Sequence, residues 1–291
     1  MISVGDILFS QRLDIDNPGD LWSCPKDYFF QGTPNQTLDV FDSVCDTGET
    51  PLRNPNTNCY ITGGGNILVS NAWADYNENI LARIKKYASA KKFKAVWGAG
   101  IDFDNNYVLN YLKNFDMVGT RVFKKKYPDS RYSFVPCVSV MNSLLDKEYE
   151  RKYDVAIIPH FKIPLPVEVY TGKWRMSKQL VEITNKPATL DKMLTAIGES
   201  ETVITSSYHA TYWAMLMNKR VICHVTGVRD SVQRKLETFE RKPTYIYEDG
   251  TFSPSLLTKL YNYSGMKEEY RELNTNFYNK VREQLANRDI L

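Results

Sequence analysis

The chain has 291 residues, of which 43% are hydrophobic and 24% are charged, a composition typical of a soluble globular protein. That length predicts two domains of about 140 residues each rather than one hydrophobic core. The net charge is only +3 and no basic stripe is sustained, which argues against a nucleic-acid binder. Lysine clusters at residues 91–94 and 124–126 are interpreted as solvated surface, with weak peripheral contact to an anionic lipid or polysaccharide left open.

The five cysteines are scattered and form no Cys-x-x-Cys pair, so we expect neither a disulfide framework nor a zinc site. No other cluster offers itself as a ligand set, and we expect no metal. The first residues lack a basic region followed by an apolar core, so no signal peptide is expected. No run of about 18 apolar residues predicts a membrane span. Together these features favour a cytoplasmic protein.

Strands alternate with helix-length segments in the first half of the chain, which is the pattern of a parallel sheet covered on both faces. The expected strands are residues 7–10, 58–62, 93–97, 116–119 and 133–135. Helices are expected at residues 21–30 and 74–90, and in the second stretch apolar side chains recur at helical spacing.

A charged stretch at residues 142–152 marks the expected domain boundary. We therefore divide the chain into residues 1–148, residues 149–265 and a C-terminal helix, 266–291, which can return to the first domain. The elements expected in the second half are strands at 154–158, 202–205, 220–224 and 244–246, and helices at 190–197 and from His209 onward. The predicted fold is α/β, with two Rossmann-like domains facing a cleft at the carboxyl ends of their strands.

The segment from Thr202 to Ile222 reads as a strand, a Ser-Ser turn, a helix and a second strand. Ser206 or Ser207 can cap the helix by accepting bonds from its first N–H groups. His209 then lies in the first helical turn, where the N–H groups and the helix dipole favour a phosphate or carboxylate. We expect its ring to lie outside apolar surroundings. The alternative is a buried histidine that happens to begin a helix.

Two glycine-rich turns follow strands of the first half, Gly63-Gly64-Gly65-Asn66 and Gly98-Ala99-Gly100. Glycine lets backbone approach a ligand closely, but a tight strand-to-helix turn explains the same pattern. Neither turn is a Gly-x-Gly-x-x-Gly fingerprint, so a dinucleotide site is not predicted.

Polar and charged residues follow other expected strands. Asp20, in Asn17-Pro18-Gly19-Asp20, can either cap a helix or act as a general base. His160 and Lys162 follow the strand at 154–158 and can hold an anionic group, and His224 ends another strand. The downstream basic residues can complete an anion site or simply be solvated, and they include Arg229, Arg234 and Lys235.

Taken in order, these motifs resemble the polysaccharide pyruvyl transferase family. The matching segments are Asn17 to Asp20, Gly63 to Asn66, Trp97 to Gly100, Gly119 to Arg121, Val135 to Cys137 and Thr205 to His209. The resemblance spans roughly residues 5 to 240. This chain has Ser207 where many members carry an arginine two residues before the histidine, which leaves the identity of the donor open.

The resemblance implies a GT-B-like fold and transfer of a pyruvyl group from phosphoenolpyruvate to a saccharide acceptor, with no cofactor. The implied catalytic residues are His209, Asp20 and His160. The implied donor-binding residues are Ser206, Ser207, Lys162, Arg229 and Lys235. The implied acceptor-binding residues are Asn17, Gly63, Gly64, Gly65, Asn66, Gly98 and Gly100. The alternatives are a GT-B glycosyltransferase that uses a nucleotide sugar and a catalytically inactive saccharide-binding protein.

Overall fold

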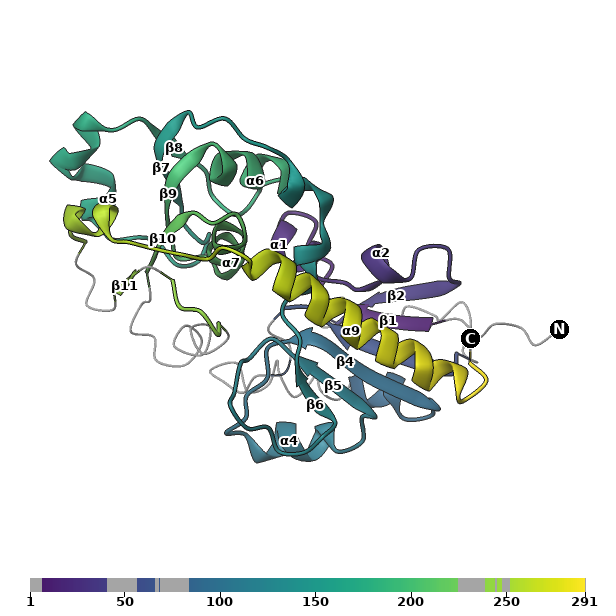
Figure 1. The fold of residues 1–291 in the computed structure, drawn as a ribbon. Coiled ribbons are helices and arrows are strands. Elements are labelled where there is room, and N and C mark those ends of the chain that lie inside the picture. The colour runs from purple at the N-terminus through teal and green to yellow at the C-terminus, as the bar shows by residue number, and fades with distance from the viewer. Residues whose placement is uncertain are drawn as a thin grey trace, which may run out of the picture. The chain divides into compact units, whose positions relative to one another are not determined.

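A computed structural model describes residues 7–40, 57–65, 68, 84–224, 239–243, 245–247 and 252–290 (Figure 1). The chain forms two compact units. Unit 1 comprises Met1–Asp14, Asp20–Ser139 and Tyr270–Leu291, and unit 2 comprises Ile15–Gly19 and Val140–Glu269. The change between units after Ser139 comes before the boundary predicted at residue 148, and the C-terminal residues from Tyr270 belong to unit 1.

Unit 1 is built on a six-stranded parallel sheet in the order β2-β1-β3-β4-β5-β6. Its strands are β1 (Ile7–Gln11), β2 (Asn35–Asp39), β3 (Cys59–Gly63), β4 (Phe93–Ala99), β5 (Met117–Thr120) and β6 (Tyr132–Phe134). Every residue of β1 and β3 is buried, as expected for strands covered on both faces. β2 was not predicted, because its sequence Asn-Gln-Thr-Leu-Asp lacks the apolar run of a central strand.

In the described part of unit 1, the helices labelled in Figure 1 are short except at the C-terminus. They are α1 (Pro18–Leu21), which begins in the segment of unit 2, α2 (Lys26–Phe29), α4 (Asn106–Leu112) and α9 (Met266–Ala286), which starts before Tyr270. The prediction of one helix over 21–30 is wrong, since Pro25 lies between α1 and α2 and disfavours helical backbone before it. Residues 84–88 are helical, and residues 74–83 of the predicted helix lie outside the described residues.

Unit 2 contains a five-stranded parallel sheet in the order β11-β10-β9-β7-β8. Its strands are β7 (Tyr153–Ile158), β8 (Leu180–Glu182), β9 (Ser200–Thr205), β10 (Arg220–His224) and β11 (Tyr245–Tyr247). Among the described residues of unit 2, the α-helices are α5 (Val167–Thr171), α6 (Leu190–Gly198) and α7 (Tyr208–Leu216). The 3₁₀ helices are η1 (Val138–Met141), at the change between units, η2 (Ser143–Asp146), η3 (Lys173–Ser177) and η4 (Pro254–Thr258).

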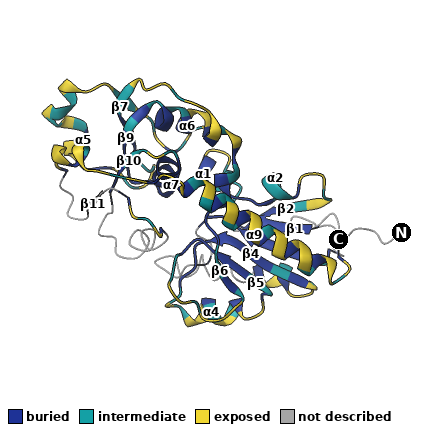
Figure 2. Ribbon diagram, in the orientation of Figure 1, coloured by how far each residue is buried: buried dark blue, intermediate teal, exposed yellow. Residues whose placement is uncertain are grey.

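Helix α7 is buried along its whole length, and Figure 2 colours it dark blue. A helix that is apolar on all sides is stable only inside a core, so its position is fixed by neighbours on every side. Helix α6 differs, because it alternates buried and exposed positions. The prediction of an α/β protein with two parallel, Rossmann-like sheets is confirmed. Within the described residues, no helix has both the length and the apolar character to cross a membrane.

Candidate functional site

The carboxyl edge of the sheet in unit 2 brings together several predicted site residues. Strands β7 and β9 are neighbours and run parallel, so the segments that follow them lie at the same edge. Pro159 to Lys162 follow β7, and Ser206 to His209 follow β9. Open α/β sheets bind ligands at this edge, where loops and helix N-termini meet. We therefore place the candidate site of unit 2 here.

Ser206 ties the two segments to each other. Its buried hydroxyl accepts a hydrogen bond from the backbone N–H of His160 (2.9 Å) and donates one to the carbonyl of Ile163. A hydroxyl has only one proton to donate, so the proton of Ser206 is committed to the loop. The geometry therefore makes Ser206 a brace for the loop after β7.

Ser207 occupies the N-cap position of α7, but its side chain makes no capping hydrogen bond. The predicted side-chain cap at Ser206 or Ser207 is therefore wrong. The turn is held differently: the backbone N–H of Ser207 donates to Oγ1 of Thr205 (2.9 Å). The carbonyl of Ser207 accepts from the hydroxyl of Thr211 (2.8 Å). These bonds fix the first turn of α7 from both sides.

The loop after β7 fixes the ring of His160. The backbone N–H of Lys162 donates to Nδ1 of His160 (3.1 Å). Because Nδ1 accepts this bond, the neutral ring carries its proton on Nε2. The next residue, Phe161, donates its backbone N–H to the side-chain oxygen of buried Asn185 (2.7 Å). The loop is thus held by two side chains from separate segments, Asn185 and Ser206.

Cationic side chains surround the ring of Phe161, which is 42% exposed. The Nζ atoms of Lys162 and Lys186 each lie 5.3 Å from the centroid of this ring. The imidazole of His160 lies 4.8 Å away, centroid to centroid. Contacts of this kind hold an ammonium group near an aromatic face without neutralising its charge. The cluster therefore offers positive charge beside a partly exposed flat ring.

Sequence reasoning did not identify Asn185 or Lys186. Both follow β8, a three-residue strand that was not predicted, so no motif marked the segment. The usable signal was the position of a Lys-Pro pair after a short Leu-Val-Glu run, which is too brief to distinguish from a loop.

His209 lies in the first turn of α7, as predicted, but its surroundings differ from the expectation. Its ring is 8% exposed and contacts the edge of Tyr208 (centroids 4.9 Å apart) and Trp213 (5.4 Å). The prediction of a ring outside apolar surroundings is wrong, because α7 is buried up to its first residue. The backbone of Gly19 also lies against the ring, and Gly19 belongs to unit 2 like His209.

The glycine turns predicted to bind the acceptor belong to unit 1. A Cβ atom on Gly63 would lie 2.2 Å from the carbonyl oxygen of Trp97, and one on Gly64 would lie 2.5 Å from Ser23. Gly64 and Gly98 also have positive φ angles, +75° and +62°. The backbone N–H of Gly64 donates to the carbonyl of Trp97 (3.2 Å). Close approach between turns is thus sufficient to require glycine there.

The remaining predicted residues divide between the units. Gly65 and Gly100 join the same turns through a bond from Gly100 N–H to Gly65 carbonyl (3.1 Å). Asp20 is the acidic residue of α1 and belongs to unit 1, whereas Asn17 belongs to unit 2. Three predicted residues lie outside the described residues, namely Asn66, Arg229 and Lys235.

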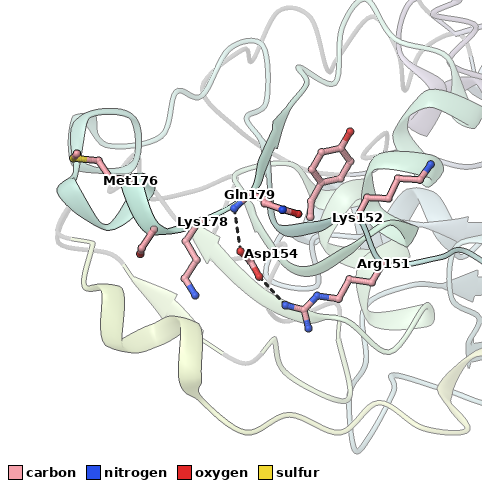
Figure 3. A pocket seen from close by; sticks show the side chains of 8 residues that line it. Arg151, Lys152, Asp154, Met176, Lys178 and Gln179 are labelled. Atoms are coloured by element: carbon pink, nitrogen blue, oxygen red, sulfur yellow. Dashed lines mark hydrogen bonds and ion pairs between the residues drawn. The ribbon is translucent and has the colours of Figure 1, made fainter.

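A hollow of about 570 Å³ lies at the opposite, amino edge of the sheet in unit 2 (Figure 3). Figure 3 shows Asp154 at its centre, where it accepts bonds from the backbone N–H of Gln179 (3.0 Å) and from Arg151 (2.7 Å). The carboxylate of Asp154 is therefore paired with a residue that lines the same hollow. Ligands of parallel sheets bind at the carboxyl edge, so we do not place the candidate site in this hollow.

No protein-family model matches the chain, and no curated protein matches it. The crystal structure of the glycotransferase of kitacinnamycin matches 97% of this chain and 99% of its own, with a TM-score of 0.56 at 9% identity. A functionally uncharacterized protein from Klebsiella pneumoniae matches 84% of this chain and 93% of its own, with a TM-score of 0.52 at 14% identity. At such identities the likeness shows the fold alone.

Proposed function

We propose that this chain transfers a pyruvyl group from phosphoenolpyruvate to two hydroxyls of a sugar in a polysaccharide or glycan precursor, forming a ketal. The observation that carries the proposal is the cluster of Lys162, Lys186 and His160 around Phe161 at the carboxyl edge of unit 2. A small donor with a phosphate and a carboxylate needs such a concentration of charge. The fold shared with a glycotransferase supports the broader class, a glycan-related transferase.

The reaction needs an acid, a base and an anion clamp. A proton adds to the methylene carbon of phosphoenolpyruvate and makes it a methyl group. The first sugar hydroxyl then adds through its oxygen to the neighbouring carbon, and the bond from that carbon to the phosphate oxygen breaks. The second hydroxyl adds to the same carbon and closes the ketal. The two sugar hydroxyls release two protons in all. One of them replaces the proton that was added to the methylene carbon, and the other goes to the solvent or to the phosphate.

The roles follow from the chemistry of each side chain. His160, Lys162 and Lys186 are proposed to hold the phosphate and carboxylate of phosphoenolpyruvate. Nε2 of His160 donates a hydrogen bond to one of these groups. His209 supplies the proton or stabilises phosphate, aided by the N-terminal dipole of α7. Asp20 is the proposed base. Ser206 braces the clamp, and Ser207 remains a proposed donor contact.

The other predicted residues keep their proposed parts. Arg229 and Lys235 are proposed to add charge on the donor side. On the acceptor side, the proposed contacts are Asn17, Gly63, Gly64, Gly65, Asn66, Gly98 and Gly100. We further propose a cytoplasmic location, where phosphoenolpyruvate and a glycan precursor meet.

The second candidate is a glycosyltransferase that uses a nucleotide sugar. The exposed ring of Phe161 favours it, since such a ring can stack on a base while the lysines contact a diphosphate. A nucleotide also needs a group that holds the ribose, whereas phosphoenolpyruvate does not. A catalytically inactive saccharide-binding protein on the same fold is the third candidate.

Binding measurements separate these candidates. Phosphoenolpyruvate is expected to raise the melting temperature and to give a measurable heat of binding, because it binds only the folded chain. The variant Lys186→Met should weaken its binding about tenfold, the value of one charge-assisted contact. The matched control Lys178→Met removes an exposed lysine at the amino edge and should leave binding unchanged. Micromolar binding of a nucleoside diphosphate without binding of phosphoenolpyruvate would reject pyruvyl transfer.

The proposed reaction uses side-chain charges and helix dipoles in place of a metal. Turnover measured with EDTA should therefore equal turnover without it. Activity that is lost in EDTA and restored by Mg²⁺ or Mn²⁺ would contradict this part of the proposal.

A further inference from the structure

Gly19 lies directly against the ring of His209. An ideal Cβ atom built on Gly19 would lie 2.1 Å from Nδ1, 2.5 Å from Cγ and 2.9 Å from Cβ of that histidine. Two of these three atoms are not at the far end of the side chain. Rotation of the imidazole about the Cβ–Cγ bond moves neither Cβ nor Cγ, so it cannot remove the clash. Any residue larger than glycine must displace the histidine or the segment that carries residue 19.

The segment that carries Gly19 has little freedom to move away. Residues Ile15–Gly19 belong to unit 2, and they run beside α7 (Figure 1). The carbonyl of Asp16 accepts a hydrogen bond from the backbone N–H of Ala188 (3.4 Å). Pro18 and Gly19 are both buried. The clash would thus fall on the histidine ring.

The other sides of the ring are closed as well. Tyr208 meets it edge-on at 86°, and fully buried Trp213 lies tilted at 36° beside it. A side chain confined on three sides keeps one orientation, and groups held in one orientation lose no further freedom when a substrate binds. Gly19 sets one of the three sides.

The backbone of Gly19 does not itself require glycine, because its φ lies outside the positive range in which other residues are strained. Helical positions normally favour alanine over glycine. The contact with His209 is therefore the physical reason for glycine at this position. We propose that Gly19 is a positioning residue that fixes the ring of His209 for the transfer reaction; this inference rests on the proposed function.

The test compares two glycines with clashes of similar severity. Gly19→Ala drives a methyl group into the His209 ring. Gly198→Ala drives one into the ring of Tyr149 (2.3 Å) in the same unit, next to the amino end of β9. Both variants are expected to lose some stability. Only Gly19→Ala is expected to lower kcat, by roughly the 10²-fold of a lost acid.

The first readout does not depend on the substrate. The chain has three histidines, so their ring signals can be assigned in ¹H–¹³C NMR spectra by single substitution. Gly19→Ala should shift the His209 signals and change their pH titration, while the His160 signals stay in place. Gly198→Ala should leave both sets unchanged. His209 signals that are unaltered in folded Gly19→Ala would overturn the proposal.

The second readout is a double-mutant cycle in kcat. If Gly19 acts through His209, Gly19→Ala should cost nothing further in a His209→Ala background. A further fall in kcat in that background would show that Gly19 affects turnover by a route other than His209, and it would overturn the proposal. If Gly19→Ala alone does not fold, the double variant decides, because His209→Ala removes the two nearest atoms, Nδ1 and Cγ, and leaves only Cβ at 2.9 Å, which a small shift relieves, so folding should be restored. Failure to restore it would also overturn the proposal.

The two hypotheses fail in different ways. A wild-type chain with no turnover of phosphoenolpyruvate, combined with shifted His209 signals in Gly19→Ala, would reject pyruvyl transfer and support the positioning role. Normal turnover of phosphoenolpyruvate by the wild-type chain, combined with unshifted His209 signals in Gly19→Ala, would support pyruvyl transfer and reject the positioning role.

Discussion

The carboxyl edges of the two sheets were both marked by unusual sequence motifs, yet the structure uses these motifs differently. In unit 1 the carboxyl ends of β3 and β4 contain glycines that pack against backbone, such as Gly63 against Trp97. In unit 2 the segments after β7 and β9 contain His160, Lys162 and His209, whose side chains we propose take part in the reaction. A motif at the end of a strand can thus serve close packing or reactivity. The surroundings of each residue, rather than its place in the fold, distinguish these uses.

The packing role of the unit 1 edge predicts the largest effect on stability. Gly64→Ala should reduce the free energy of unfolding by about 3 kcal/mol, since it combines a steric clash with Ser23 and a strained positive φ. Gly32→Ala is the matched control: its φ is +81°, but nothing lies within 4 Å of the added atom. It should cost about 1 kcal/mol. Equal losses in denaturant titrations would show that close approach is unimportant.

The chemistry proposed for the carboxyl edge of unit 2 predicts a loss of turnover when His209 is replaced. His209→Gln should lower kcat about 10²-fold, the usual contribution of a general acid or charge stabiliser. The control His224→Gln changes a buried histidine at the end of β10 and should alter kcat much less. Steady-state kinetics on variants with native circular dichroism spectra make the comparison. Equal kcat values for His209→Gln and the wild type would remove His209 from the mechanism.

The two adjacent serines sharpen the contrast between packing and chemistry within one turn. Ser206→Ala should cost about 1–2 kcal/mol, because it removes the acceptor of the His160 N–H and the donor to Ile163. Ser207→Ala should cost only a few tenths of a kcal/mol, since its side chain caps no helical N–H group. Urea denaturation measures both. A larger loss in Ser207→Ala would reverse the assignment of the brace.

The amino edge of unit 2 predicts the smallest effect, on the acid side of the pH profile. The N–H of Gln179, and then Arg151, lower the pKa of Asp154 below its usual value of 3.8. A carboxyl group with a lowered folded pKa stabilises the fold above the unfolded value and loses this contribution as pH falls through the folded value. Asp154→Asn should therefore flatten the decline of stability below about pH 4, by less than about 1 kcal/mol because solvent screens the pair. An unchanged pH profile would contradict this pairing.

Much of the fold could be read from local sequence. Strand β7 ends in a continuous apolar run and β9 contains a β-branched run, while helices α6 and α9 have helical periodicity, so burial and local geometry predict the same element. The strands β2 and β8 were missed because both are partly polar, and β8 has only three residues. Such edge strands are defined by the neighbour with which they pair, and this pairing has no local signature.

Local sequence likewise predicted some features of the candidate site, and tertiary contacts decided the others. The sequence by itself determined that His160, Lys162 and His209 follow parallel strands, because residues after a strand must lie at its carboxyl edge. Only the tertiary structure decided that Ser206 braces His160, that Lys186 joins Lys162 around Phe161, and that Gly19 touches His209. The physical reason is that the periodicity of side chains reports on a residue's own strand or helix. Contacts between distant segments depend on how closely those elements pack, and a packing distance leaves no pattern in the sequence.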